Sequence, residues 1–182
     1  ITPNGYAHNM IEFATNPDGP SQTIWGWDSW WPNPPWSTFL FRSLLDNESF
    51  KNDFINYFSD HLNTTFQPDE ILNVVDNITG ELTGEMPEHT SRWNLNLASW
   101  YNNVNALRNF IFYRNAFMWS HIQSYFNLAG TYQLFLDMDG GSGSITINSI
   151  KAYNFPWQGQ YFDQIPIQIQ AVPAPGFQFV GW

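Results

Sequence analysis

Between residues 37 and 127 the apolar positions recur with the period of an α-helix. Such a period predicts helices that each turn one face toward a core. The first stripe comprises Phe54, Phe58 and Leu62. A second stripe continues it through Ile71, Val74, Val75, Ile78 and Leu82. A third stripe, from Trp100 to Tyr125, predicts a helix of about 27 residues with Ser99 as its N-cap. The sequence therefore predicts a helical subdomain over residues 37–128.

The pattern changes to strand-like alternation in residues 129–182. Four stretches show it: TYQLFLDM, SITINSI, IPIQIQAV and FQFVGW. Glycine- and proline-containing segments separate them, and GGSG at Gly140–Gly143 predicts a hairpin connection. We expect a small antiparallel β module here, with few strands for independent stability.

Residues 1–36 have no sustained period and are dense in proline, glycine and asparagine. Within them, MIEFA at Met10–Ala14 fits either a short strand or a helical turn. Five tryptophans lie between residues 25 and 36. Together the three regions predict an α+β fold in which an irregular aromatic segment precedes the helices and the β module follows them.

The amino-acid composition excludes several classes of binding partner and chemistry. The net charge is −10 with only six Lys and Arg, so the chain lacks the cations that nucleic acid requires. Membrane insertion is also unexpected, because no apolar run approaches the roughly 20 residues of a membrane-spanning helix. Zero cysteines exclude disulfides and thiol catalysis. An aromatic-rich, lysine-poor sequence is compatible with a bacterial protein located outside the cell or in its envelope.

Three strings, in order, resemble the C-terminal part of the CotH family. They are LLDNESFKNDFINYFSDHLNTTF (Leu44–Phe66), EMPEHTSRW (Glu85–Trp93) and the Asn109–Arg114 region. CotH proteins are spore-coat and envelope proteins with an atypical, protein-kinase-like domain. HNMIEFATN and WPNPPWSTFLFRSLL are similar to bacterial members. The resemblance implies that residues 1–128 form the C-lobe-like part of a kinase-like domain. Residues 129–182 resemble the β-rich extensions of secreted bacterial proteins.

The resemblance also implies where catalysis would occur. The family's metal-binding Asp-x-Asp element would lie just upstream of Ile1, so we expect this chain to be a C-terminal fragment without catalytic residues. It would hold no cofactor, and ATP and Mg²⁺ would be needed only by a complete parent protein. His8 and Asn9 would lie beside that site, although a plain loop role for His8 is favoured. The expected partner is the missing N-terminal lobe. Without that lobe, exposed apolar surface would favour a homodimer.

Two other sets of residues resemble metal ligands. Asp137 and Asp139 could share a hard cation, but Asp before a glycine turn is ordinary turn chemistry, and we favour a turn. Glu85 and His89 lie one helical turn apart and could supply two ligands. No third ligand is evident. We therefore favour a structural hydrogen bond or ion pair that involves Arg92, in a segment that ends at Trp93.

The tryptophan cluster supports an alternative function. Trp25, Trp27 and Trp30 could form an exposed platform for stacking against sugars. The chain would then be a carbohydrate-binding or surface-adhesion module whose partner is a glycan or a surface protein. Packing of these indoles against the helices or the missing lobe is the favoured interpretation, because large aromatic side chains are most often buried.

Overall fold

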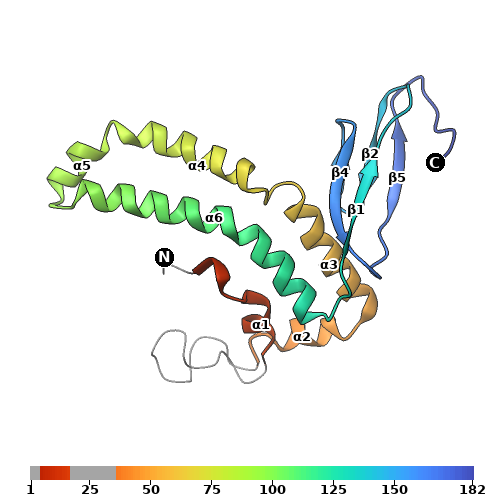
Figure 1. Cartoon of the computed structure of the whole chain (residues 1–182), viewed down its shortest axis with the longest axis horizontal. Coiled ribbons are helices and arrows are strands. Elements are labelled where there is room, and N and C mark those ends of the chain that lie inside the picture. Colours follow the sequence, from red (N-terminus) through yellow and green to blue (C-terminus); the bar gives the residue numbers. More distant parts are fainter. Residues whose placement is uncertain (1–4, 17–35) are drawn as a thin grey trace. The chain divides into compact units, whose positions relative to one another are not determined.

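The computed structural model describes residues 5–16 and 36–182 and confirms the α+β fold (Figure 1). Its helices are η1 (Gly5–Ala7), α1 (Met10–Thr15), α2 (Phe39–Leu45), α3 (Glu48–Leu62), α4 (Pro68–Thr83), α5 (Met86–Arg92) and α6 (Leu97–Tyr125). Its strands are β1 (Thr131–Leu136), β2 (Gly143–Ile147), β3 (Ile150–Ala152), β4 (Trp157–Phe162) and β5 (Ile169–Pro173). None of the helices in these described ranges is both long enough and apolar enough to cross a bilayer.

The chain divides into two compact units. Within the described ranges, the first unit holds residues 5–8 and 64–120, and the second holds residues 9–16, 36–63 and 121–182. The β strands therefore share a unit with α3, which precedes them by more than 60 residues in sequence. The division that we expected after residue 128 stays a prediction about domains.

The first unit is a hairpin of long helices. Figure 1 shows α4 and α6 side by side, with α5 at the end where they are joined. Pro68 opens α4 with Asp69 and Glu70 in its first turn, as the helix dipole favours. The predicted Ser99 cap of α6 is wrong. The side-chain oxygen of Asn96 accepts the Ala98 N–H at 2.8 Å, so Asn96 caps this helix and Ser99 lies inside its first turn.

The apolar stripe of α4 does not face a core. No residue of α4 is buried, and the side chains of Val74, Ile78 and Leu82 are 56%, 53% and 47% exposed. The expectation that this stripe packs inward is therefore wrong within the unit. Periodicity correctly predicted the helix, because it reports which face is apolar. It cannot report whether another element covers that face.

In the second unit α3 is the central helix. Asn47 caps it by accepting the Phe50 N–H at 3.0 Å. Ile55 and Leu62 are buried, and the Phe54 ring lies 5.3 Å from that of Phe41. Figure 1 shows α3 lying beside the strands. The apolar face predicted for this helix is thus buried in part.

The β module consists of two small antiparallel sheets. One pairs β1 with β4, and the other has the order β3-β2-β5. Their shared core contains Leu136, Ile145, Ile147, Ala152 and Tyr161. Because β1 and β2 belong to different sheets, the hairpin predicted at Gly140–Gly143 is wrong.

The hairpin of the module lies elsewhere, at Asn148–Ser149 between β2 and β3. Asn148 has φ 43°, a left-handed conformation that asparagine tolerates in such tight turns. Thus SITINSI contains a turn rather than one strand. FQFVGW forms no strand, whereas WQGQYF forms β4, which we did not predict because glutamine and glycine interrupt its apolar alternation.

Candidate functional site

A buried carboxylate on α3 is the centre of the densest polar network in the described chain. Asp60 is 0% exposed. Its Oδ1 accepts the Tyr161 hydroxyl at 2.8 Å and Asn148 Nδ2 at 3.1 Å. Its Oδ2 accepts the Ser149 N–H at 2.8 Å and the Ser149 hydroxyl at 2.6 Å. Both oxygens are thereby satisfied, as a buried carboxylate requires.

The carboxylate also changes the chemistry of its tyrosine partner. Burial raises the pKa of the Tyr161 hydroxyl, and the charge of Asp60 and the hydrogen bond to it raise that pKa further. The phenol, which is protonated at neutral pH in any case, therefore remains a hydrogen-bond donor into the alkaline range. Burial likewise raises the pKa of Tyr132, with a smaller contribution from the charge of Asp163.

Two asparagines on the same face of α3 extend the network. Asn56 donates to the Pro166 carbonyl at 2.8 Å. The side chain of Asn63, just after the helix, donates to the Gln160 carbonyl at 2.7 Å and accepts the Gln160 N–H at 2.8 Å. Asn63 thus pairs with β4 as a neighbouring strand would. The spacing of Asn56, Asp60 and Asn63 by four and three residues places them on one helical face, and this was the sequence signal that we missed.

The residues near the expected catalytic region have structural contacts. In the first unit, Arg114 Nη1 donates to the carbonyls of Tyr6 and His8 at 2.8 and 2.6 Å. The Tyr6 ring lies 5.0 Å from that of Tyr113. Burial lowers the pKa of the Arg114 guanidinium. These bonds fix the backbone at His8, and a position of His8 beside an active site stays a prediction.

Asn9 belongs to the second unit and caps α1. Its side-chain oxygen accepts the N–H groups of Ile11 and Glu12 at 3.2 and 3.1 Å. MIEFA, for which we left a strand or a helical turn open, forms this helix. The structural role of Asn9 is therefore assigned, and its proximity to a catalytic centre is untested.

The Glu85–Trp93 segment forms α5 with its flanking residues. Glu85, His89 and Arg92 are exposed, and no hydrogen bond or ion pair joins the side chains of these three described residues. Arg92 Cζ instead lies 5.9 Å from the centroid of the Trp93 ring, within range of a cation–π contact. The buried residue of the helix is Thr90, whose hydroxyl donates to the Met86 carbonyl at 2.8 Å.

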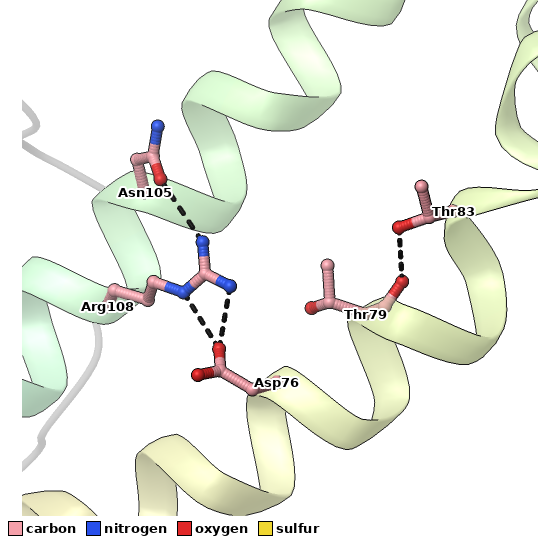
Figure 2. A network of polar contacts seen from close by, with 5 residues as sticks. All are labelled: Asp76, Thr79, Thr83, Asn105 and Arg108. Atoms are coloured by element: carbon pink, nitrogen blue, oxygen red, sulfur yellow. Dashed lines mark hydrogen bonds and ion pairs between the residues drawn. The ribbon is translucent and has the colours of Figure 1, made fainter.

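An ion pair that we did not predict joins the two long helices of the first unit (Figure 2). Arg108 on α6 donates from Nε and Nη2 to Asp76 Oδ1 on α4, at 2.9 and 2.6 Å. Its Nη1 reaches Asn105 at 3.4 Å. Both charged side chains are well exposed, at 39% for Arg108 and 56% for Asp76, so the pair contributes little to stability.

Asp137 and Asp139 lie in the connection between β1 and β2. Asp137 Oδ1 accepts the Met138 N–H at 2.8 Å, and Gly140 and Gly141 adopt positive φ. The segment is thus a bend between two strands, and the favoured turn role of Asp137 and Asp139 stays a prediction. No group of three or more potential metal-ligating side chains occurs in residues 5–16 and 36–182. Trp25, Trp27 and Trp30 lie outside the described residues, so the stacking platform remains untested.

A comparison with models of known protein families shows to which family the chain belongs. A family model described as CotH kinase protein matches residues 9–118, more than half of the 182 residues. The chain belongs to the CotH family. Searches of the curated proteins and of the solved structures found no significant match. The CotH match includes all of α3, whereas the β-module partners of Asp60 lie beyond it.

Proposed function

We propose that this CotH-family chain is a supporting, non-catalytic part of a kinase-like protein at the bacterial cell surface or envelope. The observation that carries the proposal is the polar face of α3. Its residues Asn56 and Asp60, and Asn63 directly after it, all form hydrogen bonds with the β module. In this view the CotH region is a platform that holds the β module, and the module provides attachment to a surface protein.

The requirements of phosphoryl transfer explain why Asp60 and Arg114 would stabilise the fold rather than take part in catalysis. A kinase site needs carboxylates that bind Mg²⁺ and a cation that contacts phosphates. Asp60 would have to release its four donors to bind a metal ion, and this would leave buried polar groups unpaired. Arg114 is engaged with two backbone carbonyls. Both side chains are thus committed to the fold.

The carboxylates for Mg²⁺ and the nucleotide cradle would then belong to an N-terminal lobe that is the partner of this chain. ATP and Mg²⁺ would then bind only when both parts are present. A longer polypeptide that contains the lobe should gain thermal stability from Mg-ATP, since a ligand stabilises the state that binds it.

The test is a thermal-shift titration of residues 1–182 and of the longer polypeptide with Mg-ATP. We expect no change of melting temperature for residues 1–182 and a clear increase for the longer chain. An increase for residues 1–182 alone would contradict the proposal. The double variant Asp137→Ala/Asp139→Ala would then show whether the carboxylates between β1 and β2 bind the metal.

A further inference from the structure

A polar groove runs along α3 in the second unit. Its volume is about 410 Å³, within the range of small-ligand sites. One wall is α3, from Ser49 to Asp60. The opposite wall consists of the Asn148–Ser149 turn and the segment from Pro166 to Gln168 that leads into β5. Apart from Pro166, the residues that line the groove have polar or charged side chains.

The floor of the groove is fixed by internal hydrogen bonds. Asn56 is bound to the Pro166 carbonyl, and Asn148 Nδ2 is bound to Asp60. Asn148 Oδ1 also accepts the Gln168 N–H at 2.8 Å. Both walls are therefore held at a set separation. A ligand entering the groove would not bear the cost of ordering it.

The rim, in contrast, offers polar groups that the fold does not use. The side chains of Asn52, Asp53 and Gln168 form no hydrogen bond with any described residue, and neither does the hydroxyl of Tyr57. Tyr57 is 57% exposed, and the centroid of its ring lies 4.5 Å from that of His61. An aromatic ring and three unpaired planar polar groups thus border the same groove.

These groups define a class of ligand. Amides both donate and accept, and a carboxylate accepts, so together they match neighbouring hydroxyl groups that do both. An exposed ring suits the apolar C–H face of a pyranose. Asp53 and the net charge of −10 disfavour phosphorylated or acidic ligands. The geometry points to a binding site for a neutral saccharide of one or two sugar units, an inference that does not depend on the kinase-like role.

The experiment is a ¹⁵N NMR titration of residues 1–182 with cellobiose, maltose and N,N′-diacetylchitobiose. Glucose 6-phosphate and the neutral peptide Gly-Ser-Gly-Ser serve as comparison probes. We expect at least one disaccharide to shift the side-chain amides of Asn52, Asn56 and Gln168, with saturation in the millimolar range. Tyr57→Ala should weaken that binding about tenfold, which corresponds to about 1.4 kcal/mol.

Two variants control for effects on folding. Tyr57→Phe keeps the ring and should keep most of the affinity, whereas Tyr153→Ala removes an exposed tyrosine outside the groove and should change nothing. The absence of amide shifts with all three disaccharides at about 20 mM would overturn the inference. So would tighter binding of glucose 6-phosphate, a response to the peptide alone, or equal weakening by Tyr57→Ala and Tyr153→Ala.

Discussion

Two helices of this chain, α3 and α4, have similar lengths and similar apolar periods but different environments. α3 buries Ile55 and Leu62 and binds the β module through polar side chains, whereas α4 buries no residue. An exposed ion pair joins α4 to α6, whereas a buried carboxylate with four donors joins α3 to the β module. The comparison shows that the spacing of apolar residues determines where a helix forms. The buried polar side chains determine which neighbouring element that helix binds.

The largest effect is expected from Asp60→Ala. The variant leaves the donors on Tyr161, Asn148 and Ser149 without their acceptor, so we expect a loss of about 4 kcal/mol in the free energy of unfolding of the second unit. Urea denaturation followed by near-UV circular dichroism measures it. Asp53→Ala is the matched control on the same helix, and because Asp53 is exposed it should change stability by less than about 0.5 kcal/mol. Equal effects of the two variants would remove the contrast between the buried and the exposed carboxylate of α3.

Asn63→Ala tests the second connection of α3 to the strands. It removes both hydrogen bonds to the Gln160 backbone, and the expected loss is about 2 kcal/mol in the same denaturation experiment. Asn52→Ala is the control, since the Asn52 side chain has no hydrogen bond to a described residue. That control should be neutral or slightly stabilising, because alanine favours the helix. If Asn63→Ala left the free energy of unfolding unchanged, the hydrogen bonds between Asn63 and β4 would not contribute to stability.

Tyr161→Phe should cost about 1.5 kcal/mol at neutral pH, because it removes one donor from Asp60 and keeps the ring. Its pH dependence has a defined sign. The folded protein holds the pKa of Tyr161 above its ordinary value, so this stabilisation is complete below the unfolded pKa of about 10 and decreases as the pH rises above it. The wild-type chain should therefore lose stability above pH 10 more steeply than Tyr161→Phe. Identical alkaline slopes would show that Tyr161 does not titrate with unfolding.

The smallest effect is expected in the first unit. Asp76→Ala removes the exposed ion pair with Arg108, and the expected loss is at most about 0.5 kcal/mol. In 1 M NaCl the difference should vanish, because salt screens exposed charges. Thermal melts at low and high salt measure both. If Asp76→Ala lowered the stability by more than about 1 kcal/mol even in 1 M NaCl, the ion pair of α4 would contribute like a buried interaction. The contrast between α3 and α4 would then be lost.

Much of the helical region was predictable because periodicity and capping are local. The helical nature of the three apolar stripes and the approximate length of α6 followed from residues within a few turns. The pairing of β2 with β3 and β5 was not predictable, since GGSG offered a stronger local turn signal than Asn148–Ser149. Asp60 was missed for a related reason. The spacing of Asn56, Asp60 and Asn63 marks a polar helix face, but it does not identify the donors to Asp60, which lie 88 to 101 residues away.

The structural unity of α3 and the β module is tested most directly by native-state hydrogen exchange over a guanidinium series. The prediction is that amides of α3 (Glu48–Leu62) and β4 (Trp157–Phe162) converge on one opening free energy, as members of one cooperative unit do. The prediction would be contradicted if the amides of β4 exchanged through an opening free energy more than about 1 kcal/mol below that of the amides of α3. The β module would then be an independent appendage rather than a structure that the CotH region supports.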